Sequence, residues 1–222
     1  MIDLPKSTIF GKRIPKQKFY DNLTVPAHLK RVFAEQINLI TWRNKIAPTT
    51  LNIAEGESVK EIEIISIRLN QRELDKRVLP LIDKEIPYHI LFLLEYNKET
   101  QAWISYKEHV CAVSSRQSVS AFKPGIYYHT DWLKPEALNL RIDGLNMDKV
   151  YENLIRQVAG ERLGDKDDDI KESVKRDEQR RKLTKEIAAL EKKAMKEQHP
   201  RRKWELAEEV NKLKAQMEVH TE

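Results

Sequence analysis

The chain has 222 residues, of which 40% are hydrophobic and 34% are charged, so it is long enough for one ordinary core and an appendage. Its single cysteine excludes an intramolecular disulfide and indicates a reducing cytoplasm, and with no apolar run longer than five residues we expect neither a signal peptide nor a transmembrane helix. The net charge is +5, and residues 170–222 carry most of it, with 15 Lys and Arg against 11 Asp and Glu.

The N-terminal segment, residues 1–23, interleaves lysines and Arg13 with large apolar side chains. We interpret it as a basic arm that packs on the core while its lysines extend to solvent. The alternative is an arm that binds phosphate groups.

The first predicted helix covers residues 26–38, because Thr24 and Pro26 suit a helix start and apolar residues follow at helical spacing. The pattern then changes to alternation, which predicts a strand over residues 40–48. A second strand is expected over residues 61–69, where β-branched residues are dense.

Residues 72–85 have helical spacing, and Pro80 in the interior predicts a kink. The apolar block at residues 90–94 has the length of a strand buried on both faces. After a four-residue break, residues 101–107 alternate with period 2, so the two segments are predicted to form a hairpin around which the N-terminal part packs.

Beyond the hairpin, residues 113–123 are small and polar and predict a loop. A last strand is expected over residues 126–132. The closing helix should be capped by Asp143 or Asn146 and should end at Gly160.

These elements predict an α+β fold, with a mixed sheet of roughly five strands covered by helices, because strands and helices do not alternate regularly. We expect the core domain to span residues 1–163. The charged residues 164–169 form the predicted linker, and residues 170–222 form a basic helical hairpin.

The hairpin prediction rests on two apolar series that share a 4-3-4 spacing on either side of Pro200. A chain reversal at Pro200 apposes them in four layers of an antiparallel coiled coil. The alternative is one long kinked helix in an oligomeric coiled coil. The eight seam residues are Leu183, Ile187, Leu190, Ala194, Leu206, Val210, Leu213 and Met217.

An isolated two-helix hairpin is marginally stable, so we expect the core, a second copy or a partner protein to stabilise it. Met195 and Trp204 lie off the seam near the turn and have the side chains of interface anchors. The alternative is that Trp204 folds back on the core. The charged side chains expected to orient a partner are Arg180, Arg181, Glu191 and Lys192.

Enzymatic chemistry has weak support in the sequence. The six glycines are isolated and form no phosphate-binding loop, and we expect no metal and no cofactor. A metal-dependent nuclease needs an acid-x-Lys pair, but Ser105 stands where Lys107 requires the acid. The alternative enzyme hypothesis therefore uses Glu61, Glu63, Glu95 and Lys107. His129 and Asp131 lie on one predicted strand and could share a metal ion, but a structural histidine beside a surface acid is the preferred interpretation.

Several segments in order, among them KRIPKQKFYDN (12–22), IPYHILFLLEY (86–96), YYHTDWL (127–133) and VYENLIRQVAG (150–160), resemble the bacterial domain-of-unknown-function family 4391. The resemblance carries over no catalytic residues. It implies gene neighbours that encode helicases and DNA methyltransferases in restriction or anti-phage defence loci.

Two classes of function follow. The first is a non-catalytic accessory subunit that docks a helicase-type partner or another defence subunit through the hairpin, with nucleic acid as an additional expected partner. The second is a divergent nuclease or a stand-alone nucleic-acid-binding protein. We expect no membrane partner, and a homo-oligomer that forms through the hairpin is a further alternative.

Overall fold

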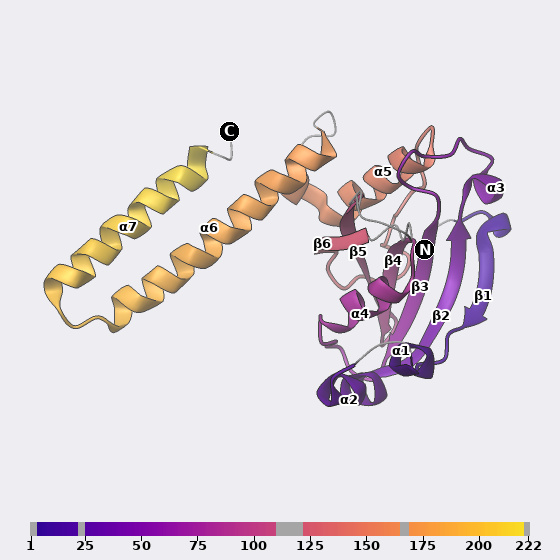
Figure 1. Ribbon diagram of the computed structural model, residues 1–222, viewed down its shortest axis with the longest axis horizontal. Coiled ribbons are helices and arrows are strands. Elements are labelled where there is room, and N and C mark those ends of the chain that lie inside the picture. Colours follow the sequence, from indigo (N-terminus) through magenta and orange to yellow (C-terminus); the bar gives the residue numbers. More distant parts are fainter. Residues whose placement is uncertain (1–3, 22–24, 110–121, 165–168, 220–222) are drawn as a thin grey trace, which may run out of the picture. The chain divides into compact units, whose positions relative to one another are not determined.

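The computed structural model describes residues 4–21, 25–109, 122–164 and 169–219. These residues divide into two compact units, residues 1–160 and 161–222. The first unit is built on one mixed sheet and the second contains a pair of long helices, so the predicted α+β class is confirmed (Figure 1).

The sheet has six strands in the order β1-β2-β3-β4-β5-β6, one more than expected. Neighbours pair antiparallel except β3 and β4, which are parallel. Parallel strands need a crossover, and the segment containing α4 supplies it. The strands are β1 (Ile9–Arg13), β2 (Ile37–Ile46), β3 (Ile62–Leu69), β4 (His89–Tyr96), β5 (Glu99–His109) and β6 (Phe122–His129).

The helices of the first unit are short except for α5. They are α1 (Gln17–Asp21), α2 (Ala27–Gln36), α3 (Pro48–Leu51), α4 (Val78–Glu85) and α5 (Met147–Ala159), with a 3-10 turn η1 at Lys6–Thr8. A 3-10 turn η2 (Gly160–Leu163) spans the boundary between the units, and the second unit contains α6 (Ile170–Lys196) and α7 (Pro200–Val219). None of the helices in the described part of the chain has both the length and the apolar character of a membrane span.

The core occupies both faces of the sheet. On one face, Phe33 of α2 and Leu79 of α4 pack in a cluster with Ile65, Phe92 and Trp103 of the central strands. Side chains alternate along a strand, so His89 points to the face opposite Ile90. There the His89 ring meets Tyr151 of α5 with ring centroids 4.3 Å apart, which places α5 on the second face.

The central hairpin has a tighter turn than expected. Its loop is only Asn97 and Lys98, whose φ values of 44° and 65° lie in the left-handed region that two-residue hairpin turns require. The sequence pattern suggested a four-residue gap because Glu99 and Thr100 are polar. Both residues nevertheless pair with β4.

The predicted kink at Pro80 is wrong. Helix α4 begins at Val78 and not at residue 72, so Pro80 is its third residue. The first four N–H groups of a helix have no partner within it, and the proline therefore removes no hydrogen bond there. The loop predicted over residues 113–123 lies almost entirely outside the described residues.

Candidate functional site

Two acidic side chains meet at the start of β3. Glu61 and Glu63 are two residues apart and therefore face the same side of the sheet. Glu61 Oε2 lies 2.7 Å from Lys45 Nζ, and Glu63 Oε2 accepts a 2.6 Å hydrogen bond from Trp42 Nε1. Lys45 and Trp42 both come from β2, which pairs with β3.

Glu63 is fully buried, and its pKa is raised to about 7, chiefly by burial. The neighbouring Glu61 carboxylate contributes to the rise, while the hydrogen bond from Trp42 and the charge of Lys45 oppose it. Glu63 is therefore a group that changes its protonation near neutral pH. Such groups are candidates for functional sites.

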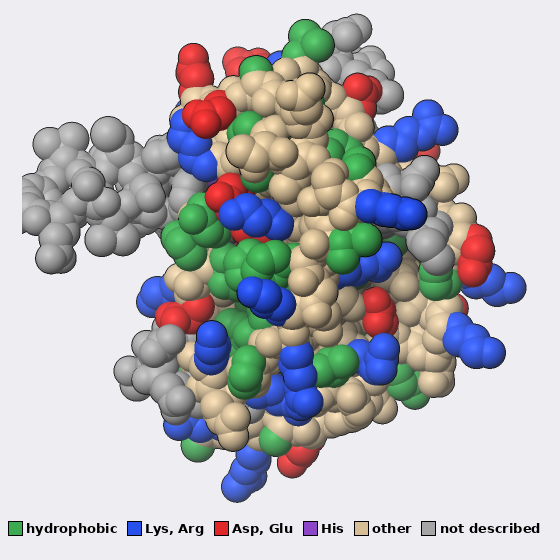
Figure 2. All heavy atoms as spheres, turned by 90° about the vertical axis from the view of Figure 1, so that its right-hand side faces the viewer, with side chains coloured by type: hydrophobic (Ala, Val, Ile, Leu, Met, Phe, Trp, Pro, Cys, Tyr) green, Lys and Arg blue, Asp and Glu red, His purple; other side chains and the backbone are tan. Residues whose placement is uncertain are grey.

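The surroundings of this acid pair are basic and aromatic. Phe10 of β1 lies 4.3 Å from the Trp42 ring, and Lys12 Nζ lies 4.6 Å from the centroid of Phe10. β1 is largely exposed and presents Lys12 and Arg13 to solvent. Figure 2 shows Lys and Arg side chains spread over the side of the molecule on which β1 lies, with hydrophobic patches between them.

Lys107 lies in a different, buried network. Its Nζ is 2.7 Å from Asp83 Oδ1 and also donates to the carbonyl oxygen of Tyr88 at 2.5 Å. The hydroxyls of Ser105 and Tyr127 donate to Asp83 Oδ2 at 3.0 and 2.7 Å.

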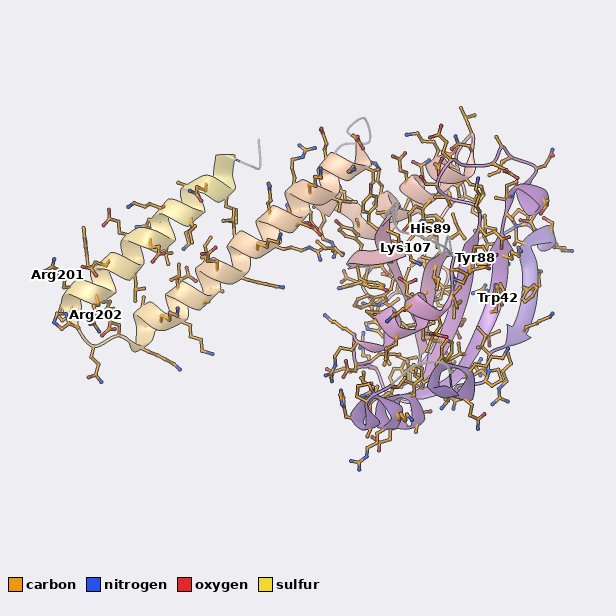
Figure 3. All side chains as sticks on the ribbon, viewed as in Figure 1. Trp42, Tyr88, His89, Lys107, Arg201 and Arg202 are labelled. Carbon is orange, nitrogen blue, oxygen red and sulfur yellow. The ribbon has the colours of Figure 1, made fainter. Side chains whose placement is uncertain are left out.

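This network has the features of a structural contact between α4 and the sheet. Burial lowers the pKa of Lys107, and the Asp83 charge opposes the shift. A buried ion pair with several hydrogen bonds holds its geometry tightly. Lys107 is thus held by Asp83 in the interior, and both side chains are inaccessible to solvent. Figure 3 labels Lys107 and Tyr88 among the side chains of the first unit.

Glu95 is separated from the other acids. Glu95 lies opposite Arg68 in the register of β3 and β4, and both residues face the side of the sheet opposite Glu63. Glu95 Oε1 accepts a 2.6 Å hydrogen bond from the Ser66 hydroxyl. The structure therefore brings Glu61 and Glu63 together but does not join them to Glu95 or to Lys107. Among the described residues, no three His, Cys, Asp or Glu side chains are placed to hold one metal ion.

His129 has a structural environment. Its ring stacks on Trp103 with centroids 4.3 Å apart, and Nδ1 lies 2.9 Å from the carbonyl oxygen of Thr130. Asp131 is exposed and lies beyond the end of β6.

The second unit carries the predicted seam. Ile187, Leu190 and Val210 are buried in one cluster, and Leu206, Leu213 and Met217 pack against it. Leu183 and Ala194 are half-buried. Lys214 reaches across from α7 to Glu191 of α6 at 2.8 Å, as expected for an antiparallel pair.

The end of the helix pair at the turn between α6 and α7 carries both exposed apolar side chains and exposed basic side chains. Met195 is 82% exposed and Trp204 is 65% exposed. Residues 192–204 contain six Lys and Arg and one Glu, and all six cations are exposed. Figure 3 labels Arg201 and Arg202 of this segment, which we call the hairpin tip.

The charged residues predicted to orient a partner divide into two groups. Arg180 and Arg181 form ion pairs with Asp177 of the same helix at 2.8 and 2.7 Å, far along α6 from the tip. Glu191 is paired with Lys214. Lys192 is exposed and has no ion pair within the described chain.

With this geometry in hand, comparison with known families gives one match. The model of a family described as Domain of unknown function (DUF4391) matches residues 2–217. The chain belongs to this DUF4391 family. No curated protein and no solved structure matches the chain. The match covers both units, so the helix pair is part of the DUF4391 architecture along with the sheet.

The sequence analysis did not identify the side chains that bind the predicted site residues, namely Asp83 for Lys107, Trp42 for Glu63 and Lys45 for Glu61. Asp83 lies four residues after Leu79 on the buried side of α4, and an acid in an apolar helical stripe was a readable signal of a buried partner. Trp42 and Lys45 had no comparable signal, because their contacts to Glu63 and Glu61 depend on how β2 pairs with β3.

Proposed function

We propose that this protein is a non-catalytic accessory subunit of a bacterial DNA-processing or anti-phage defence complex, and that its hairpin tip docks a larger helicase-type partner. The observation that carries the proposal is the exposure of Met195 and Trp204 beside a basic surface. The helicase class of the partner follows from the gene neighbourhood that the resemblance implies.

The tip combines two residue types that are enriched in interface cores, Met195 and Trp204, with a charged surround that suits an interface rim. Trp, Met and Arg are enriched at protein interfaces, and Trp and Arg are frequent energetic anchors. The seam residues Ile187, Leu190 and Val210 are already buried against one another, so Met195 and Trp204 are not needed to hold the helix pair. They remain available to a partner.

The charge of the tip selects the chemistry of that partner. Six cations against one acid in residues 192–204 favour an acidic surface with an apolar pocket for Trp204. Such charges mainly raise the rate of encounter and set orientation, whereas the buried anchors supply most of the affinity. Salt should therefore slow association more than it speeds dissociation.

The catalytic alternative has less support. The nuclease hypothesis needs Glu61, Glu63, Glu95 and Lys107 near one metal ion. Glu95 lies on the face of the sheet opposite Glu63, and Lys107 is held in an ion pair with Asp83. Stand-alone binding to nucleic acid is the remaining alternative, because the cations of the tip also suit phosphate groups.

The test is co-purification of the tagged full-length chain with the helicase encoded beside it. The double variant Met195→Ala and Trp204→Ala should weaken association at least tenfold, while its thermal unfolding stays within a degree or two of the parent. Leu145→Ala is the matched control, since Leu145 is 91% exposed in the first unit.

Two results would contradict the proposal. Undiminished association of the double variant would place the interface elsewhere in the chain. Binding of the protein alone to DNA or RNA that is lost on Arg201→Ala and Arg202→Ala, without any helicase association, would favour the nucleic-acid alternative.

A further inference from the structure

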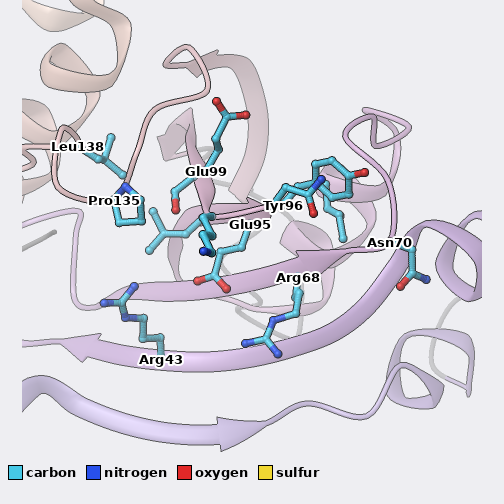
Figure 4. A pocket seen from close by; sticks show the side chains of 13 residues that line it. Arg43, Arg68, Asn70, Glu95, Tyr96, Glu99, Pro135 and Leu138 are labelled. Carbon is cyan, nitrogen blue, oxygen red and sulfur yellow. The ribbon is translucent and has the colours of Figure 1, made fainter.

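A cavity of about 670 Å³ opens on the face of the sheet opposite Glu63, at the ends of β3 and β4. Its charged lining includes Arg43 of β2, Arg68 of β3 and Glu95 of β4 (Figure 4). The volume lies in the range of small-molecule sites. Ligands of sheets with parallel strands often bind beyond the carboxyl ends of those strands.

The two arginines have no ionic or hydrogen-bonded partner within the described part of the chain. Neither arginine takes part in an ion pair or a side-chain hydrogen bond among the described residues. Each guanidinium group nevertheless has five N–H donors. The two guanidinium groups outnumber the Glu95 carboxylate that lines the same cavity, so an anionic ligand would balance the remaining positive charge.

Local backbone geometry aims Arg43 at this cavity. The register of β2 against β3 shifts between Trp42 and Asn44, so Arg43 is the extra residue of a β-bulge. Bulges redirect side chains and are frequent beside functional sites. Asn44, the next residue, is buried and held by a 2.9 Å hydrogen bond to Thr8, which anchors the bulge.

Glu95 supplies an acceptor in the same cavity. Its carboxylate is held by the Ser66 hydroxyl at 2.6 Å, and its residue is paired with Arg68 in the sheet. Glu99 also lines the cavity, but its carboxylate lies 3.1 Å from Arg72. The arginine pair is therefore in excess over the acid, and the apolar wall is formed by Leu69, Leu93, Pro135 and Leu138.

We propose that this cavity binds the phosphoryl group of a small hydroxyl-bearing phosphate ester, of the class of sugar phosphates and mononucleotides. The planar guanidinium groups of Arg43 and Arg68 bind the phosphate oxygens in a bidentate manner, a geometry that lysine does not reproduce. Glu95 accepts a hydrogen bond from an adjacent hydroxyl of the ligand. The apolar wall covers the remainder of the molecule.

The proposal is independent of the docking function of the hairpin tip, because the two sites share no residue. Isothermal titration calorimetry of the full-length protein should show saturable binding of ribose 5-phosphate or AMP. Arg68→Gln and Arg43→Gln should each weaken this binding at least tenfold, and Arg68→Lys at least fivefold. Arg31→Gln is the control, because it removes one exposed charge from α2, away from the cavity. It should change the affinity for ribose 5-phosphate or AMP less than twofold.

Glu95→Gln distinguishes recognition of the ligand hydroxyl, which the proposal assigns to Glu95, from recognition of the phosphoryl group by the two arginines. It should weaken ribose 5-phosphate at least fivefold but leave inorganic phosphate unchanged or slightly tighter, because only the ester carries alcohol hydroxyl groups beyond its phosphoryl group. Tighter binding of AMP than of ribose 5-phosphate identifies a mononucleotide, and equal binding identifies a sugar phosphate. The proposal is overturned if none of these probes binds, or if Arg68→Gln, whose exposed side chain permits normal folding, binds as the parent does.

Discussion

The buried carboxyl group of Glu63 should make the stability of the sheet fall as pH rises. Its pKa is about 7 in the folded chain, against about 4.3 for an unfolded glutamate. Between these values the folded chain holds a proton that the unfolded chain has released, so the free energy of unfolding decreases with pH. At 1.36 kcal/mol per pKa unit, the full loss is about 3.7 kcal/mol once the pH exceeds 8, and about 2.5 kcal/mol of it falls between pH 5 and pH 8.

Glu63→Gln isolates this effect. The amide is neutral at every pH, and its oxygen can still accept the hydrogen bond from Trp42 Nε1. We expect the variant to match the parent near pH 5 and to be more stable by about 2 to 3 kcal/mol at pH 8. Urea unfolding followed by circular dichroism between pH 5 and 8.5, at constant ionic strength, measures both curves. Glu73→Gln, at an exposed position, should leave the pH dependence unchanged.

One outcome would refute this reasoning. If Glu63→Gln is neutral at pH 5 but destabilises the chain at pH 8, the folded state stabilises the ionised carboxylate. Repeating the titration with Mg²⁺ and with a chelator would then show whether a cation binds beside Glu61 and Glu63. Such a cation would restore support for the nuclease alternative.

The remaining predictions concern the buried ion pair, the seam, the hairpin turn and catalysis. Lys107→Ala should cost about 3 to 5 kcal/mol of unfolding free energy, since it strands Asp83 in the interior, and Lys107→Met should cost less; chemical denaturation measures both. Leu190→Ala should destabilise the helix pair by about 2 to 4 kcal/mol, and faster proteolysis within residues 170–219, with residues 1–160 still resistant, would show it. Lys98→Gly should raise the unfolding free energy by about 0.5 to 1 kcal/mol, because glycine accepts the left-handed turn conformation without strain; an unchanged denaturation midpoint would contradict this. Plasmid DNA incubated with Mg²⁺ or Mn²⁺ should stay intact, and cleavage that Lys107→Ala abolishes would establish the enzyme instead.

Patterns that depend on near neighbours were readable from the sequence. The apolar block of β4 and the alternation of β5 predicted the central hairpin, because burial on a sheet face repeats every second residue. The matched 4-3-4 series around Pro200 predicted α6 and α7 for the same reason, with a helical period. Asn146, one of the two caps that the sequence allowed, caps α5 by accepting a hydrogen bond from the Lys149 amide, and Asp143 does not.

The edge strand β1 could not be predicted in this way. Its five residues are almost wholly exposed, so they carry no alternation of apolar and polar side chains. Its conformation comes from pairing with β2, more than twenty residues later in the chain. A basic segment that packs on the core and a basic segment that forms an edge strand have the same composition.

The sequence alone determined the α+β class, most of the elements and the seam of the helix pair, since burial imposes a local period on each of them. The tertiary structure decided which polar side chains meet. Strand pairing placed Glu63 beside Trp42 and put Glu95 on the opposite face, and the crossover through α4 brought Asp83 to Lys107. The placement of Arg43 and Arg68 at one cavity required both a β-bulge and the order of the strands. Such contacts join residues distant in the chain, and no periodicity along one segment encodes them.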